Sequence, residues 1–235
     1  MNIIIPLAGN GSRFNNIYNV PKPLIPVNGL PMISRAIQSL GFGAKYHFVI
    51  RDNEFKQQTI DAISSVCLNP TILSIDYLTE GTASSALLLQ DYINSNEELI
   101  IANCDQITNW DSASILEKLQ KYDGTVVTIL SSDPKHSYVK LDNTSCAVQF
   151  AEKVVISNIA LTGIHYWKHG SDFVNSATKM INMKNKAANG EFYIAPTYNY
   201  MIEVGKKIGI CQVTKNELAF VGTPSDLTRY LDENR

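Results

Sequence analysis

The chain has 235 residues, of which 45% are hydrophobic and 18% are charged. This balance is ordinary for a globular protein with one large core, so we expect a single domain over residues 1–235. The formal net charge is −2, which excludes a general basic field for nucleic acid or anionic lipid. No apolar run reaches membrane-spanning length. We therefore expect neither nucleic acid nor a membrane as a partner, and any anion-binding site must be local.

The cysteine pattern favours reduced thiols. Cys67, Cys104, Cys146 and Cys211 are isolated and show no Cys-x-x-Cys spacing. No basic segment followed by an apolar one precedes the first predicted strand, so a secretory signal peptide is not indicated. We expect a cytoplasmic protein.

The chain opens with a predicted buried strand, Ile-Ile-Ile at residues 3–5, which leads into a turn of small residues at 9–12. Arg13 and then Lys22 supply the first cations. Glycines let backbone N–H groups approach an anion closely. Arginine offers phosphate oxygens a fork of donors, and lysine adds a movable point charge. Together these parts indicate a polyphosphate site.

This turn matches neither of the two common phosphate-binding motifs. The dinucleotide fingerprint needs a third small residue where this chain has Phe14, and the P-loop needs Gly-Lys followed by Ser or Thr. A purely structural turn beside a proline-rich edge is the alternative interpretation.

Helices and strands alternate through the first half of the chain. Helices are predicted at residues 33–40, 53–66, 83–93 and 113–121, and strands at 46–50, 71–76, 99–102 and 125–130. This rhythm is typical of a parallel sheet. Strands at 138–142, 147–152 and 159–167 then follow one another with short turns, which adds antiparallel pieces. Helices are predicted again at 171–183, 189–204 and after Pro224, with a strand at 208–213.

A second turn rich in small and hydroxylated residues, 77–85, runs from a strand end into a helix. The amides of that helix N-terminus and the hydroxyl groups would point at one spot. A simple helix cap is the alternative interpretation.

A carboxylate follows the buried strand at 99–102, which breaks into Asn-Cys-Asp-Gln with the acid at Asp105. The carboxyl ends of central strands are where open α/β sheets bind ligands. An oxygen ligand of this kind suits Mg²⁺. Capping of the next helix is the alternative, but Asp111 and Ser112 already stand at its start.

These segments together resemble the nucleotidylyltransferase family, whose members join a nucleotide to a phosphorylated sugar or a small phospho-alcohol. The resemblance rests on Leu-Ala-Gly-x-Gly-x-Arg-Phe at residues 7–14 and Pro-Lys-Pro-Leu-Ile-Pro-Val-x-Gly-x-Pro-Met-Ile at 21–33. It continues through Glu-Lys at 152–153, Thr-Gly at 162–163 and Gly-Thr-Pro-x-Asp-Leu at 222–227. It implies an α/β fold, a Rossmann-like (GT-A-like) three-layer sandwich with a mainly parallel central sheet and a small antiparallel annex.

The resemblance also implies roles for particular residues. The catalytic cations would be Arg13 and Lys22. The nucleotide would contact Leu7, Ala8, Gly9, Asn10, Gly11, Ser12, Arg13, Lys22, Glu80, Gly81, Thr82 and Ala83, with the turn at 80–83 lying against its base or ribose. The acceptor would contact Asp105, Lys153, Gly163 and Glu191. Asp105 would bind Mg²⁺, residues 1–130 would form a nucleotide-binding half, and residues 131–235 would form an acceptor-binding half.

Two positions depart from the family pattern. Val154 stands where the family often has proline. Many relatives carry a second metal-binding aspartate two residues before Gly222, where this chain has Phe220. Glu217 is close by in the sequence, but nothing in the sequence makes it a substitute. Metal binding would then rest on Asp105, the phosphates and water.

No histidine is assigned to catalysis, neither His47 nor His136, His165 or His169. A phosphomonoester acceptor has a second pKa near 6, so it is largely dianionic at neutral pH and needs no general base. The implied reaction transfers a nucleoside monophosphate from a triphosphate to a sugar phosphate or other small phosphomonoester and releases pyrophosphate. CTP is the first expectation, then UTP or dTTP, in capsule or surface-polysaccharide biosynthesis.

Two other functions stay open. A nucleotide-sugar-dependent glycosyltransferase is one, although its Asp-x-Asp motif is missing because Asn103 precedes Cys104 and Asp105. A nucleotide-binding regulatory relative without turnover is the other. A homodimer is a family-level expectation.

Overall fold

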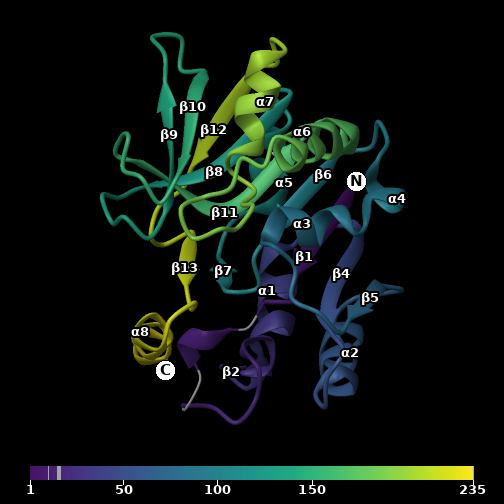
Figure 1. Ribbon diagram of the computed structural model, residues 1–235. Coiled ribbons are helices and arrows are strands. Elements are labelled where there is room, and N and C mark those ends of the chain that lie inside the picture. Colours follow the sequence, from purple (N-terminus) through teal and green to yellow (C-terminus); the bar gives the residue numbers. More distant parts are fainter. Residues whose placement is uncertain (10, 15–16, 235) are drawn as a thin grey trace.

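The apolar run at the start of the chain forms the centre of the sheet (Figure 1). A computed structural model describes residues 1–9, 11–14 and 17–234, and of Ser12 only the backbone. Strand β1 (Asn2–Pro6) pairs in parallel with β4 (Lys45–Arg51) on one side and β6 (Leu99–Ala102) on the other. Strand β5 (Thr71–Ile75) extends this parallel core beyond β4.

Antiparallel strands extend the other side of the sheet. Strand β11 (Ile159–Trp167) pairs with β6 and with β8 (Gly124–Leu130). Beyond it lie β9 (Ser137–Leu141) and β10 (Ala147–Glu152), while β12 (Ile208–Gln212) runs parallel to β8. The predicted parallel core with antiparallel additions from the second half is therefore confirmed.

Helices cover both faces of the sheet. Successive side chains of a strand point to opposite faces, so a buried strand such as β1 packs against both layers of helices. Ile3 and Ile5 pack in a cluster with residues of α1 (Met32–Leu40), α2 (Lys56–Ser64) and α5 (Ser112–Leu119). Ile4 packs on the opposite face with residues of α3 (Thr82–Leu87), α6 (Gly170–Asn182) and α7 (Thr197–Glu203). This is the expected three-layer α/β sandwich.

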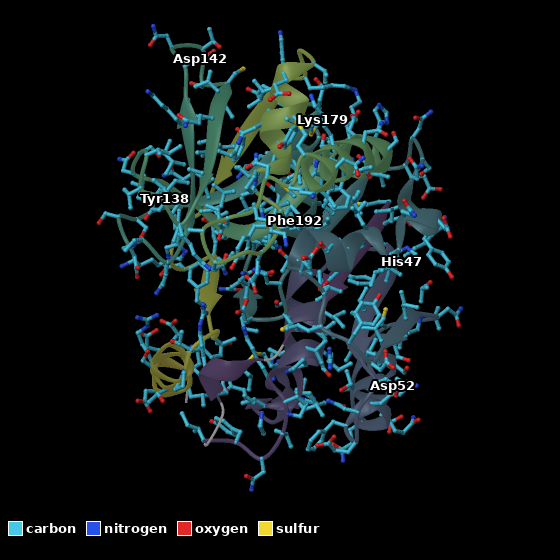
Figure 2. All side chains as sticks on the ribbon, viewed as in Figure 1. His47, Asp52, Tyr138, Asp142, Lys179 and Phe192 are labelled. Carbon is cyan, nitrogen blue, oxygen red and sulfur yellow. The ribbon has the colours of Figure 1, made fainter. Side chains whose placement is uncertain are left out.

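Two helix predictions are partly wrong. The helix expected at 83–93 divides into α3 and α4 (Gln90–Ile93). The helix expected at 189–204 begins only at Thr197. Residues before it pack on the turn at 80–83 instead, since Phe192 N donates to Glu80 O at 2.7 Å and Ala83 N donates to Phe192 O at 3.0 Å. Figure 2 shows Phe192 in the middle of the molecule, where it is 2% exposed.

Short elements that the sequence did not predict surround the carboxyl end of β6. Strand β7 (Gln106–Thr108) pairs with β13 (Leu218–Phe220), which sets Phe220 opposite Gln106. Helix α8 (Pro224–Glu233) follows, with proline in its first turn as predicted. The hairpin of β2 (Pro26–Val27) and β3 (Leu30–Pro31) and the single turns η1 (Ser12–Phe14) and η2 (Lys22–Leu24) shape the opening segment. The last part of the chain thus returns to Asp105.

The four cysteines are unpaired, as predicted, and Cys67, Cys104 and Cys211 are buried. None of the helices in the described ranges has both the length and the apolar character that crossing a membrane requires.

Candidate active site

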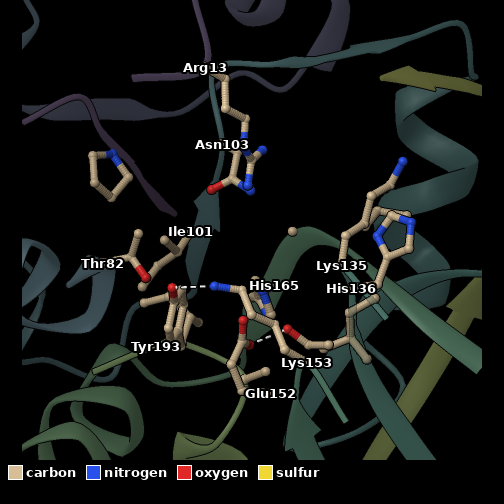
Figure 3. Close-up of a pocket in the computed structure, with 17 residues that line it drawn as sticks. Arg13, Thr82, Ile101, Asn103, Lys135, His136, Glu152, Lys153, His165 and Tyr193 are labelled. Carbon is tan, nitrogen blue, oxygen red and sulfur yellow. Dashed lines mark hydrogen bonds between the residues drawn. The ribbon is translucent and has the colours of Figure 1, made fainter. Parts of the chain in front are cut away.

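Two adjoining pockets lie at the carboxyl ends of β1 and β6. The loop pocket, of about 210 Å³, is bounded by the segment after β1, by Lys22 and by the segment from Asn103 to Asp105. The sheet pocket, of about 230 Å³, lies over β9, β10 and β11, with Arg13 and Asn103 facing Lys153 and Tyr193 (Figure 3). Both pockets share Thr82 and Asn103 as walls, so ligands bound in them would lie next to each other.

The structure brings most of the predicted residues to these pockets. The loop pocket is lined by Leu7, Gly9, Gly11, Lys22, Thr82 and Asp105, and the sheet pocket by Arg13, Thr82, Lys153 and Gly163. Of the other described candidates, Ala8 and Ala83 are buried, and Glu80, Gly81 and Glu191 line neither pocket. Asn10 lies outside the described residues, and Ser12 is described only as the backbone that starts η1.

Lys22 and Asp105 form an ion pair in the loop pocket. Lys22 Nζ donates a hydrogen bond to Asp105 Oδ2, and the two side chains are only 18% and 16% exposed. Burial alone would lower the pKa of Lys22, but the charge of Asp105 and this hydrogen bond outweigh it and raise the pKa above its usual value. The ammonium group is therefore charged at neutral pH, and its present partner is the predicted metal ligand.

The end of the chain fixes the position of Asp105. Val221 N donates to Asp105 O at 2.9 Å, and Gln106 Nε2 lies 3.3 Å from Asp105 Oδ1. A Cβ atom on Gly222 would come within 2.4 Å of Asp105 Oδ2. The glycine of the closing motif is therefore needed because the backbone passes directly over this carboxylate.

Lys153 is held at the sheet pocket by a chain of polar contacts. Its Nζ donates to the Tyr193 hydroxyl at 2.6 Å and lies 4.5 Å from the centre of the tyrosine ring. The Tyr193 hydroxyl in turn donates to Glu191 Oε2, which also accepts from Asn189 Nδ2 at 2.8 Å. The hydrogen bond from Tyr193 is the main reason that the pKa of Glu191 is lowered. Glu191 thus supports the groups that orient Lys153, and its contact with an acceptor stays a prediction.

Gly163 makes room where the two pockets meet. Its φ is +102°, and a Cβ atom there would lie 2.2 Å from Asn103 Nδ2 and 2.8 Å from Gln106 Nε2. The absence of a side chain at Gly163 therefore lets Asn103 stand at the boundary between the pockets.

Comparison with known proteins identifies the family to which this geometry belongs. A family model described as nucleotidyl transferase matches residues 2–228. The chain belongs to the nucleotidyl transferase family. The resemblance drawn from the opening motifs is thereby confirmed, and with it the class of enzyme.

The relatives of this nucleotidyltransferase are distant in sequence. The bifunctional protein GlmU of Methanocaldococcus jannaschii is 25% identical over 215 residues, which are 89% of this chain and 49% of GlmU. GlmU of Methanococcus maripaludis is 23% identical over 220 residues, with the same two coverages. The chain therefore spans about half the length of these curated relatives.

Solved structures share the fold over nearly the full chain. The nucleoside-diphosphate-sugar pyrophosphorylase of Vibrio cholerae RC9 matches with a TM-score of 0.84 and 22% identity, covering 98% of this chain and 99% of its own. A putative glucose-1-phosphate thymidylyltransferase of Bacillus anthracis has a TM-score of 0.78 and 22% identity, covering 100% and 95%. The inositol-1-phosphate CTP transferase of T. maritima has a TM-score of 0.76 and 14% identity, covering 99% and 96%.

Few side chains in the described part of this nucleotidyltransferase are placed to bind a metal ion. Among the described residues, no group of three or more His, Cys, Asp or Glu side chains could hold a metal ion. The ring of Phe220 lies against His136, with centroids 5.4 Å apart, and the Glu217 carboxylate accepts from Thr214 N and Oγ1 at 2.8 Å each. Asp105 alone fits Mg²⁺ nevertheless, since this ion is often held by one carboxylate with substrate phosphates and water.

Several residues of the sheet pocket were missed or given no role. Burial raises the pKa of the Glu152 carboxyl, which accepts a hydrogen bond from Ser137 Oγ. Glu152 is part of the Glu-Lys motif at 152–153, and this motif could have identified it as a site residue from the sequence. Tyr193 and His165 also line the pocket, and no spacing or composition marks either of them.

Gly81 is required for the contact between the turn at 80–83 and the segment around Phe192. Its φ is +118°, and a Cβ atom would lie 2.5 Å from Phe192 O. We expect Gly81→Ala to lower the free energy of unfolding by about 3 kcal/mol, because it combines backbone strain with overlap. Urea denaturation measures this, with Gly43→Ala as control, since a Cβ there meets nothing within 4 Å. Equal stabilities of the two variants would contradict the expectation.

The burial of His165 predicts that the fold is sensitive to acid. His165 is 6% exposed and stacks against both Trp167 and Tyr198, and burial lowers its pKa to about 3. The unfolded chain takes up this proton near pH 6.5, whereas the folded chain does not until near pH 3, so stability falls as the pH drops through this window. From pH 7 to pH 5 we expect the wild type to lose about 2 kcal/mol more than His165→Phe. Denaturation at both pH values measures this, and parallel losses would refute it.

Proposed function

We propose that the chain transfers a nucleoside monophosphate from a nucleoside triphosphate to a small phosphomonoester and releases pyrophosphate. The observation that carries the proposal is the adjacency of two cation-bearing pockets, one with Lys22 and the other with Lys153, which share Thr82 and Asn103. A phosphoryl-transfer site needs two anions side by side, and these pockets can hold them.

The chemistry of this proposal is positioning and charge compensation. The acceptor is largely dianionic at neutral pH, so it attacks the α-phosphorus without a general base. The barrier then comes from repulsion between two anions and from alignment of the attacking and leaving oxygens. Lys22 would stabilise the α-phosphate, Arg13 and the backbone amides at 9–12 would hold the pyrophosphate that leaves, and Lys153 would hold the acceptor phosphate. Preorganised cations of this kind stabilise developing charge.

Asp105 is the residue that would hold Mg²⁺ in this reaction. Bound there together with the triphosphate, the ion would neutralise phosphate charge. Lys22 would then exchange Asp105 Oδ2 for the α-phosphate as its anionic partner.

The substrate proposal is a cytidine nucleotide and a polyhydroxylated acceptor such as a sugar phosphate, with UTP and dTTP next. Two fold relatives carry names that fit such acceptors, a nucleoside-diphosphate-sugar pyrophosphorylase and an inositol-1-phosphate CTP transferase. The lining of the sheet pocket also supports it, because Glu152, Thr162 and Tyr193 are groups that can hydrogen-bond hydroxyls. A role in capsule or surface-polysaccharide biosynthesis, a cytoplasmic location and a homodimer belong to the same proposal. So does a single domain with halves at 1–130 and 131–235.

The test measures pyrophosphate release from the purified protein with Mg²⁺. CTP, UTP, dTTP, ATP and GTP are each combined with a panel of small phosphomonoesters, including sugar phosphates and phosphocholine. Release with one pair is the expected result and fixes the base and the acceptor together. A triphosphate that raises the melting temperature while no acceptor reacts would overturn the transfer reaction and favour a regulatory protein, an outcome for which Phe220 in place of a second acid gives a reason.

A further inference from the structure

Arg51, at the carboxyl end of β4, has hydrogen-bonding capacity that the described part of the chain does not use. Its Nη1 is buried without an acceptor, and its Nη2 donates to the backbone oxygen of Asp76 at 3.3 Å. A guanidinium group is always charged and carries five N–H donors in a fixed plane. Buried donors without partners are rare in folded proteins, and such a group indicates a missing ligand or water.

Arg51 lines a third pocket, which is continuous with the loop pocket. This lateral pocket has a volume of about 180 Å³, and its walls include Ile50, Arg51, Asn53, Pro21 and Thr59. It shares a further set of residues with the loop pocket, namely Leu7, Gly9, Lys22 and Pro23. One ligand can therefore extend from the loop pocket into the lateral pocket.

The lining of the lateral pocket suits a flat ring better than a phosphate. Leu7, Ile50 and two prolines give it apolar walls, and Arg51 and Asn53 supply polar groups. Apolar walls with a few placed polar groups are typical of sites that bind organic ligands. Of the features suited to phosphates or to a metal ion bound with them, Gly11 and Asp105 line the loop pocket and Arg13 lines the sheet pocket, while the Lys22 ammonium points to Asp105.

We propose that Arg51 recognises the base of the bound nucleotide and selects cytosine over uracil and thymine. Two neighbouring acceptors, O2 and N3, lie on one edge of cytosine and match two N–H groups of a guanidinium fork. Uracil and thymine carry an N3–H on that edge. This donor would face an N–H donor of the guanidinium group and could not form a hydrogen bond with it. This inference rests on the proposed function, because it takes the triphosphate to lie in the loop pocket.

The experiment measures the dissociation constants of CTP, UTP, dTTP and GTP by titration calorimetry in the presence of Mg²⁺. For the wild type we expect CTP to bind at least tenfold more tightly than UTP or dTTP. In Arg51→Gln this preference should fall to threefold or less, mainly through weaker CTP binding, because a site built to pair with a group discriminates strongly against a ligand that lacks it. Arg51→Lys should behave like Arg51→Gln, because an ammonium group lacks the planar fork.

Arg35→Gln is the matched control, because Arg35 Nε is also buried without an acceptor but this residue lines a different pocket with Thr108 and Tyr230. It should keep the wild-type preference. Melting of the ligand-free variants shows that they are folded. An unchanged CTP preference in Arg51→Gln, an equal loss for all four nucleotides, or a wild type that prefers UTP, dTTP or GTP would each overturn the inference.

These outcomes are separable from the failure of the proposed function. Base selectivity that depends on Arg51 without pyrophosphate release from any acceptor would support the inference and refute the transfer reaction. Pyrophosphate release with a base preference that is unchanged in Arg51→Gln would refute the inference and support the transfer reaction.

Discussion

Lys22→Ala is expected to lower the rate of pyrophosphate release about 10²–10³-fold at saturating substrates, the usual effect of removing one group that stabilises transition-state charge. The affinity for the triphosphate should change less than tenfold, because the backbone amides and Arg13 still hold the other phosphates. The reason is that charge on the α-phosphate builds up in the transition state, so Lys22 acts more strongly there than on the bound substrate. This result depends on the proposed reaction.

Steady-state kinetics and nucleotide titrations together measure this separation of turnover from binding. Lys45→Ala is the matched control, since Lys45 is 69% exposed and pairs with Glu97 on the surface. That control should turn over at the wild-type rate. Unchanged turnover in Lys22→Ala would remove Lys22 from catalysis, and an equal loss of affinity and turnover would make it a binding residue only.

The approach of Lys22 to Asp105 follows from features that the sequence displays. Asp105 lies in the loop that follows the apolar strand at 99–102, and Lys22 belongs to the segment that follows another. Neighbouring parallel strands place their carboxyl ends at one edge of the sheet, and β1 and β6 are neighbours. The helix cap at Asp111 was also predicted from the sequence, and the structure confirms it, since the Asp111 carboxylate accepts from Ala113 N and Ser114 N. Local patterns were sufficient for these positions.

The contacts around Phe192 were not predictable in the same way. The segment 189–196 has helix-like composition, but hydrogen bonds to Glu80 and Ala83, more than a hundred residues away, hold it in an irregular conformation. Tertiary contacts of this kind override local propensity. Because Tyr193 reaches Lys153 only through this docking, sequence patterns alone could not place Tyr193 in the sheet pocket.

Strands of three residues leave almost no periodic signal, so β7 and β13 were also missed. Their pairing decides what stands beside Asp105. The resemblance implied that Phe220 stands where many relatives carry a second acid, and the structure adds that its ring packs on His136. The substitution therefore fills the place with an aromatic contact rather than with another ligand.

Asp105→Asn tests how much of the reaction depends on a single acid. We expect turnover to fall about 10³-fold and to stay low when the Mg²⁺ concentration is raised, because the described residues include no group of three or more His, Cys, Asp or Glu side chains that could hold the ion instead. The substitution also removes the charge that raises the pKa of Lys22 against the effect of burial. The residual activity should therefore fall further at high pH than that of the wild type.

Asp111→Asn is the control for Asp105→Asn, because Asp111 caps α5 and lines neither pocket of the active site. It should keep wild-type turnover and its response to Mg²⁺. Rates measured across a Mg²⁺ series separate the two variants. If Asp105→Asn recovers to within tenfold of the wild type at high Mg²⁺, the ion is held chiefly by the substrate phosphates, and the main role of Asp105 is then to keep Lys22 charged and in position.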